Sequence, residues 1–211
     1  RGVLHRDIKP SNIMIGEFGE TVVLDWGLAK VKSQPEDPLE QQIRDMPQRL
    51  AGKETPLPET KAGQAMGTPE YMPPEQAQGL VEQIDERSDL YSLGVVLYEL
   101  LTGTTPFRAD TASETMRRVI LQEVPPVLEK ERDAPPELVS ICEKALQKKP
   151  SDRYESVVAL AEEVKRFQTG ALVRTYRYSL RELARRYYAR HRTVLHVVAA
   201  AAGIILFLAV F

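Results

Sequence analysis

The first residues of the chain carry side chains that could accept a proton, stabilise an anion and hold a metal ion. The run reads HRDIKPSN and places Asp7, Lys9 and Asn12 close together. A carboxylate can act as a general base, and a flexible ammonium suits a charge that moves during a reaction. Carboxylate and amide oxygens are the ligands that Mg²⁺ prefers, and Asp25 follows Asp7 by eighteen residues. Each residue alone would more often belong to a turn, so the joint spacing is the signal.

Three further motifs follow HRDIKPSN in a fixed order. They are DWG at 25–27, GTPEYMPPE at 67–75 and SDLYSLG at 88–94. Together the four motifs resemble the eukaryotic-type Ser/Thr protein kinase family from Arg1 to about Phe167. The apolar segment beyond them resembles that of the bacterial membrane-anchored members. An isolated H-R-D is a weak signal, whereas four ordered motifs are highly specific.

The resemblance implies a role for each residue of the opening constellation. Asp7 would accept the proton of the attacking Ser or Thr hydroxyl, and Lys9 would steady the transferred phosphoryl group. Asn12 and Asp25 would hold Mg²⁺, with Mn²⁺ as an alternative, and with Lys9 they would bind ATP. Lys9 followed by Pro10 is the Ser/Thr version of this loop.

The resemblance also implies residues that support the site. Thr68 is expected in the substrate loop, with its hydroxyl hydrogen-bonded to Asp7 and Lys9. Glu75 is expected to form a buried ion pair with Arg153, and Asp89 to hold the backbone of the HRD turn. The expected structural supports are His5, Arg6, Glu75, Asp89 and Arg153.

Arg6 has a second implied role, because this arginine can pair with a phosphate on the activation segment, which runs here from Asp25 to Glu75. Thr55 and Thr60 are the expected acceptors, with Ser33 less favoured. The alternative is that residues 33–64, rich in Pro, Gln and Glu and without apolar periodicity, form an inert flexible insertion. The sequence favours neither.

One residue departs from the family pattern. Trp26 stands where the family commonly has Phe, so the motif reads DWG. Trp is larger and carries an N–H, and it can pack in place of Phe if that group finds a hydrogen-bond partner. The substitution is therefore expected to be tolerated, with an effect on how readily the site switches on.

Charge divides the chain unevenly. Residues 171–193 hold seven Arg and one Glu, a formal charge of +6, so the rest carries −8. An acidic body without a basic stripe argues against nucleic-acid binding. The lone Cys142 cannot form an internal disulfide and is interpreted as a buried apolar residue in a reducing compartment.

The last eighteen residues, Val194–Phe211, contain no formally charged residue. Eighteen helical residues span about 27 Å, close to the hydrocarbon core of a bilayer. The Arg-rich flank predicts a single-pass anchor in the cell membrane with residues 1–193 in the cytoplasm. A buried core helix is the alternative.

The expected fold is mainly α (α+β): a protein-kinase-like C-terminal lobe with a short β-hairpin, then one transmembrane helix. Strands are expected at 13–15 and 21–24, and helices within 85–103, 113–122, 135–149 and 156–170. The expected divisions are a partial catalytic domain at 1–168, a basic juxtamembrane segment at 169–193 and the transmembrane helix at 194–211.

The sequence contains no G-x-G-x-x-G motif and no strand lysine of the kind that grips nucleotide phosphates in this family. We therefore interpret the chain as a fragment, truncated upstream and also downstream, and expect it to transfer phosphate negligibly alone. The complete protein would phosphorylate Ser or Thr of protein substrates in membrane-linked signalling, with homodimers allowing autophosphorylation. A non-catalytic pseudokinase that serves as a binding module is the alternative. A small-molecule kinase is disfavoured by GTPEYMPPE.

Overall fold

The computed structural model describes residues 2–31, 40, 43–44 and 68–210, with the side chains of 199 and 207–210 excepted. The chain divides into two compact units, Arg1–Thr175 and Tyr176–Phe211, which are described separately.

Unit 1 begins with two small antiparallel sheets. β1 (Val3–Leu4) pairs with β4 (Lys30–Val31), and β2 (Ile13–Ile15) pairs with β3 (Thr21–Val23). In the second sheet Ile13 faces Val23 and Ile15 faces Thr21. This hairpin was predicted one residue longer, to Leu24. The ladder ends at Ile13 and Val23 because Pro10–Asn12 form a 3₁₀ turn, although the Leu24 N–H still donates to the Asn12 carbonyl at 2.8 Å.

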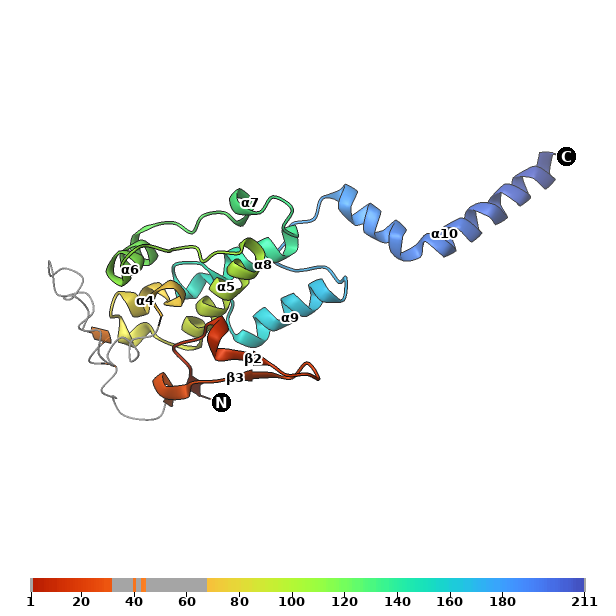
Figure 1. Cartoon of the computed structure of the whole chain (residues 1–211). Helices are drawn as coiled ribbons and strands as arrows, with labels where there is room; N and C mark the ends of the chain where they lie inside the picture. Colours follow the sequence, from red (N-terminus) through yellow and green to blue (C-terminus); the bar gives the residue numbers. More distant parts are fainter. Residues whose placement is uncertain (1, 32–39, 41–42, 45–67, 211) are drawn as a thin grey trace. The chain divides into compact units, whose positions relative to one another are not determined.

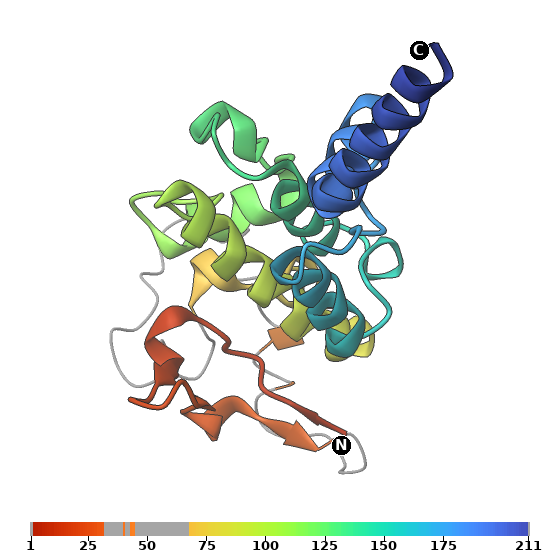
Figure 2. The same ribbon diagram turned by 90° about the vertical axis from the view of Figure 1, so that its right-hand side faces the viewer.

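The remaining regular structure among the described residues of unit 1 is helical, and the hairpin lies along one side of these helices (Figure 1, Figure 2). The described helices are α4 (Pro74–Ala77), α5 (Glu86–Thr102), α6 (Ala112–Leu121), α7 (Val127–Lys130), α8 (Pro136–Ala145) and α9 (Val157–Gln168). Short 3₁₀ turns occur at η1 (Pro10–Asn12), η2 (Trp26–Leu28), η3 (Pro69–Tyr71), η4 (Val81–Gln83) and η5 (Pro150–Asp152). The fold is thus mostly helical with a short hairpin.

Side-chain caps fix where the longer helices begin. The Asp85 carboxylate accepts from the Arg87 N–H at 2.8 Å, and the Ser156 hydroxyl accepts from the Ala159 N–H at 3.2 Å. At the other end of α5, Gly103 adopts φ 73°, a left-handed conformation that glycine accepts without strain. The predicted start at Ser156 and stop at Gly103 are confirmed.

The core of unit 1 forms around α5. Tyr91, Val95 and Tyr98 on α5 pack in one cluster with Val127 of α7 and Cys142 of α8. The Cys142 thiol lies 3.6 Å from the Gly94 carbonyl, and burial raises its pKa. The prediction of a buried, unreactive cysteine therefore agrees with its surroundings.

The last residues of unit 1 are held by a buried carboxylate. Glu163 of α9 accepts hydrogen bonds from the backbone N–H groups of Arg174 (2.7 Å) and Thr175 (3.1 Å). The Thr175 carbonyl in turn accepts from the Ser140 hydroxyl at 3.0 Å. Val173 is buried. The compact unit therefore continues past residue 168, where the sequence predicted the basic segment to begin.

Residues 33–64 were interpreted as a long flexible loop, and most of them lie outside the described residues. At Glu40, Ile43 and Arg44 the backbone is helical, and Glu40 and Ile43 are buried. Ile43 belongs to the core cluster that contains Leu4 and Met72. The loop interpretation is wrong at these positions, because a single buried Ile in a Pro-rich stretch gives no periodic signal.

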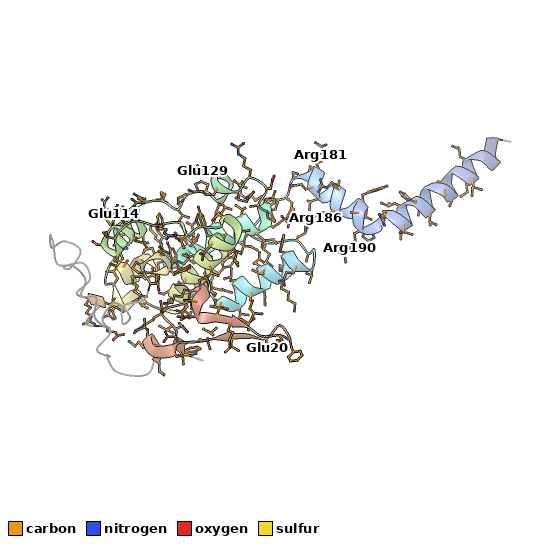
Figure 3. All side chains as sticks on the ribbon, in the orientation of Figure 1. Glu20, Glu114, Glu129, Arg181, Arg186 and Arg190 are labelled. Atoms are coloured by element: carbon orange, nitrogen blue, oxygen red, sulfur yellow. The ribbon has the colours of Figure 1, made fainter. Side chains whose placement is uncertain are left out.

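Unit 2 contains one helix, α10 (Leu180–Val210). Figure 3 shows Arg181, Arg186 and Arg190 in its N-terminal half, and the run without charged residues begins at Val194. Among the described residues, α10 is the one helix long and apolar enough to cross a membrane, over Leu180–Leu206. The basic and apolar segments, which the sequence analysis separated at residue 193, share one continuous helix.

Candidate active site

Asp7 lies in the loop between β1 and η1, and its carboxylate contacts residues from two segments. Oδ2 lies 2.7 Å from the Lys9 Nζ, and Oδ1 accepts from the Thr68 N–H at 3.1 Å. The Lys9 ammonium also donates to the Thr68 hydroxyl at 2.8 Å. The three residues form a closed triangle in which an ammonium and an acceptor carboxylate lie side by side.

Asn12 belongs to the same cluster. Its side-chain N–H₂ donates to the Asp7 carbonyl at 2.9 Å and to Asp7 Oδ2 at 3.2 Å. Because the amide nitrogen is used for Asp7, the amide oxygen is the atom left to face a metal ion. Asn12 is buried, so its orientation is fixed by these bonds.

A side chain of α5 holds the backbone before Asp7 by hydrogen bonds. Asp89 accepts from the His5 N–H and from the Arg6 N–H, both at 2.8 Å. Burial raises the pKa of Asp89, while these two backbone donors oppose that rise. Arg6 has φ 67°, a conformation that non-glycine residues rarely adopt and that costs about 1–3 kcal/mol. The two hydrogen bonds that the Asp89 carboxylate accepts offset that strain. They also fix the backbone direction at Asp7.

Asp25 is placed differently from Asp7. Its side chain is exposed, and its backbone is in the left-handed conformation, with φ 58°. Its Oδ1 accepts a weak hydrogen bond from the Gly27 N–H at 3.4 Å. Within the described part of the chain, no hydrogen bond or ion pair joins Asp25 to Asp7 or Asn12, and no three acidic, His or Cys residues cluster together. The structure therefore brings Asp7, Lys9, Asn12 and Thr68 together but leaves Asp25 without a direct bond to them.

Trp26 finds the partner that its N–H requires. The indole Nε1–H donates to the Val23 carbonyl at 3.0 Å, and the ring packs on His5 with centroids 4.7 Å apart. His5 is in turn within 2.9 Å of the Leu24 carbonyl through Nε2. Trp26 thus links the DWG turn to the HRD turn, although 53% of it remains exposed.

Glu75 and Arg153 form a buried bidentate pair. Arg153 Nη1 and Nη2 donate to the two Glu75 oxygens, each at 2.8 Å. Further donation goes to the backbone carbonyls of Arg87, Lys148 and Gln147, and the Ser88 hydroxyl donates to Glu75 at 2.7 Å. Both side chains are almost fully buried, so this network joins the end of the activation segment to the loop before α9.

Sequence reasoning missed one set of contacts around Arg6. Arg6 Nη2 lies 3.1 Å from Glu40 Oε1, and the Lys30 ammonium contacts the same oxygen. Neither Lys30 nor Glu40 belongs to a motif, so no local signal could have found them. Thr55, Thr60 and Ser33, the expected phosphate acceptors, lie outside the described residues.

Comparison with known proteins places these residues in a wider group. The model of the protein kinase domain family matches residues 1–165. A Ser/Thr-protein kinase PknD of Protochlamydia amoebophila is 40% identical over 172 residues, which cover 81% of this chain and 17% of the relative. The Ser/Thr-protein kinase pkn3 of Myxococcus xanthus is 39% identical over 169 residues, covering 77% and 27%. The chain thus spans about a sixth of the length of the first relative and about a quarter of the second.

Proposed function

Because this chain belongs to the protein kinase domain family, we propose that it carries the proton-accepting and metal-binding part of an ATP-dependent protein Ser/Thr kinase. The observation that carries the proposal is the triangle of Asp7, Lys9 and Thr68, closed by contacts of 2.7–3.1 Å. This arrangement places a carboxylate, an ammonium and a hydroxyl around one point, as phosphoryl transfer to a hydroxyl requires.

Each side chain has a defined task in this proposal. Asp7 orients the substrate hydroxyl and accepts its proton. Its carboxylate is in a fixed position for this task, because it is buried and both of its oxygens accept hydrogen bonds. Lys9 neutralises charge that develops on the transferred group. Thr68 fixes both partners and presents the substrate loop beside them.

The donor set fits Mg²⁺ with ATP. The Asn12 amide oxygen and the Asp25 carboxylate are hard oxygen ligands, and Mg²⁺ takes few protein ligands when phosphate oxygens and water complete its shell. Bound Mg²⁺ would supply charge neutralisation at the nucleotide phosphates. Asn12 and Asp25 would be the residues that hold the ion, and the exposed Asp25 carboxylate is accessible to it.

The test uses the natural protein that contains this chain, with radiolabelled ATP and a protein substrate. Asp7→Asn removes the proton acceptor while keeping the side-chain volume, so the rate should fall roughly 10²- to 10⁴-fold. Asp133→Asn makes the same change at an exposed position and serves as the matched control. Label on Ser and Thr of the substrate supports the proposal. Nucleotide binding without any turnover would instead favour the pseudokinase alternative.

We expect the 211 residues alone to turn over negligibly, because the sequence contains no glycine-rich loop to hold ATP in line. The same assay on the 211-residue chain tests this expectation, and robust phosphate transfer would contradict it.

The proposal places the protein in the cell membrane through the apolar part of α10, with unit 1 in the cytoplasm. The arginines of the N-terminal half of α10 support this orientation. Resistance of the membrane-bound protein to alkaline carbonate extraction, together with protease access to unit 1 from the cytoplasmic side only, would support it. Release by carbonate would contradict it.

A further inference from the structure

Residues 180–193 form the N-terminal part of α10 and are called here the basic half of that helix. They include five Arg and one acidic residue, Glu182. The Glu182 carboxylate accepts from the Ser179 N–H and from the Ser179 hydroxyl, each at 2.7 Å, and the same hydroxyl accepts from the Glu182 N–H at 3.2 Å. This reciprocal capping box fixes the start of the helix. One carboxylate offsets one cation at most, so the basic half keeps a formal excess of four positive charges.

The stability of the helix does not explain the positions of these arginines. Arg181 stands in the first turn, where the positive end of the helix dipole disfavours a cation. Arg181, Arg190 and Arg192 are exposed, and no carboxylate in the described part of the chain lies within ion-pair distance of them. The anion that best complements these side chains therefore comes from outside the helix.

An exposed apolar stripe runs along the same half of α10. Leu180, Leu183, Tyr187 and Val194 recur at spacings of three, four and seven residues, so they share one side of the helix. Leu180, Tyr187 and Val194 are 86%, 62% and 62% exposed. Unit 2 therefore leaves this stripe uncovered.

The arginines border the stripe on both sides. With about 100° of rotation per residue, one edge is formed by Arg181, Arg185 and Arg192, and the opposite edge by Arg186 and Arg190. A helix of this pattern suits the boundary between headgroups and acyl chains, because the stripe can enter the apolar layer while long arginine side chains reach the phosphates. Guanidinium groups also bind phosphate oxygens in a bidentate geometry.

The course of α10 places this pattern at a membrane surface. The run without charged residues begins at Val194 and continues the same helix. Figure 1 shows that α10 bends between its basic half and its apolar half, so the basic half can follow the surface while the apolar half crosses the bilayer.

We propose that the basic half of α10 binds anionic phospholipid headgroups, with its apolar stripe toward the acyl chains and its arginines on the lipid phosphates. This inference rests on the proposed membrane placement. Residues 176–211 hold six Arg and one Glu, a formal charge of +5, so with a total of −2 the rest of the chain carries −7. The basic half, and not unit 1, is thus the part that a negative surface attracts.

The first experiment measures access of trypsin to the basic half. The natural protein that contains this chain is placed in nanodiscs of phosphatidylcholine, or of an equimolar mixture with phosphatidylglycerol. Cleavage after Arg186 and Arg190 is followed by mass spectrometry, relative to cleavage after exposed Arg132 of unit 1. Phosphatidylglycerol should slow it about tenfold or more. Equal cleavage in both lipids would overturn the proposal. Equal protection in both would do so too, because protein would then cover the arginines.

Charge variants test whether the arginines are responsible. Arg181→Gln/Arg185→Gln/Arg192→Gln should lose most of the protection after Arg186 and Arg190, whereas the same three changes to Lys should keep it. The matched control, Lys130→Gln/Arg132→Gln/Lys149→Gln, makes the same change in net charge at exposed positions of unit 1 and should keep the protection, with cleavage after Arg108 as its reference. Sodium chloride at about 1 M should weaken the protection by screening. Full protection in the Gln variant would overturn the proposal.

The second experiment tests which side of the basic half faces the acyl chains. Tyr187→Trp places an indole in the apolar stripe, and Ala189→Trp places one on the opposite side of the helix. In anionic nanodiscs, lipids brominated on their acyl chains should quench the fluorescence of Tyr187→Trp at least about twofold more than that of Ala189→Trp, after subtraction of the wild-type signal from Trp26. Equal quenching of the two variants would overturn the proposed orientation.

The results separate this inference from the membrane placement. A protein that resists carbonate extraction but shows no lipid-dependent protection keeps its anchor and loses the proposed lipid surface. A protein that carbonate releases, yet that anionic lipid protects, loses the anchor and keeps the lipid surface. Neither result depends on kinase activity.

Discussion

Asp7 and Asp25 are both carboxylates of the proposed site, yet their surroundings differ. Asp7 is buried and held by Lys9, Asn12 and Thr68. Asp25 is exposed, and its one described side-chain hydrogen bond is a 3.4 Å contact within its own turn. We call the surroundings of Asp7, which are fixed by hydrogen bonds and ion pairs, the locked region. We call the exposed surroundings of Asp25 the open region.

The locked region also includes Asp89, which binds the backbone before Asp7, and the Glu75–Arg153 network. The open region continues from Asp25 onto the hairpin, where Met14, Ile15 and Phe18 are 53%, 73% and 94% exposed. A proton acceptor must be aimed before the substrate arrives, whereas metal ligands can be drawn into place by the ion and nucleotide that they bind. Under the proposed function, the chain itself fixes the proton acceptor Asp7 and leaves the metal ligand Asp25 to be ordered by a ligand.

The largest expected effect lies in the locked region, at Arg153. Arg153→Met leaves the Glu75 carboxylate buried without its partner, so the free energy of unfolding should fall by about 3–5 kcal/mol. Urea denaturation of the chain in detergent, followed by circular dichroism, measures it. Arg117→Met, which breaks an exposed pair with Glu114, should change the free energy of unfolding far less, because water screens an exposed ion pair. Equal effects of the two variants would remove the distinction drawn here.

Packing beneath the site predicts the next effect, at Gly94. A Cβ built there would lie 2.9 Å from the Ala145 Cβ, on the face where α5 meets α8. Gly94→Ala should therefore destabilise the chain by about 1–3 kcal/mol, against the usual gain from replacing a helical glycine. The same denaturation measures it. A stabilised variant would show that α5 and α8 can separate without loss.

In the open region the expected effect is on rate rather than on stability. Trp26→Phe keeps an aromatic ring against His5 but loses the hydrogen bond from the indole N–H to the Val23 carbonyl. A hydrogen bond of this kind contributes about 0.5–1.5 kcal/mol to holding the turn in place. Steady-state kinetics of the natural protein should show a rate lower by roughly two- to tenfold. Phe18→Leu, at the tip of the hairpin, is the control and should leave the rate unchanged. A large loss of stability in Trp26→Phe would place this turn in the locked region instead.

The smallest expected effect is a pH dependence at the edge of the locked region. Burial lowers the pKa of Lys148 from 10.5 to about 8, and its ammonium lies 4.4 Å from the Phe107 ring centroid. Between these values the unfolded state binds more protons than the folded state, so the contribution of Lys148 to stability rises with pH.

The measurement is urea denaturation at several pH values from 8 to 10. Lys148→Met should flatten the rise in the free energy of unfolding across this range, whereas Lys149→Met, at an exposed neighbouring position, should keep it. Identical slopes in Lys148→Met and wild type would show that this lysine does not contribute.

The sequence predicted the elements that carry strong local patterns. Two short apolar runs joined by a Gly-containing turn predicted the Ile13–Ile15 strand, and a polar start with a terminal glycine predicted α5. The expected residues of the HRD turn came from ordered motifs rather than from any periodicity, and the structure places Asp7, Lys9, Asn12 and Thr68 in contact. Motif order thus carried information about the site that local propensity does not contain.

The rest depends on contacts between distant segments. β1 and β4 are two residues long, too short for an alternating pattern, and they form because the chain brings Leu4 opposite Lys30. Glu40 lies in a polar stretch whose composition suggests solvent exposure, and burial beside two cations is what fixes it. A single sequence does not encode such a pairing in any local window.

The buried Glu163 has a practical consequence for where the chain can be cut. The family match ends at residue 165, but the two backbone N–H groups that satisfy this carboxylate belong to Arg174 and Thr175. A protein that ends at residue 165 would leave the buried Glu163 carboxylate without these two backbone donors, and it should aggregate on expression. A protein that ends just past Thr175 keeps both donors. The structural edge of the domain is thus set by hydrogen bonding rather than by sequence similarity.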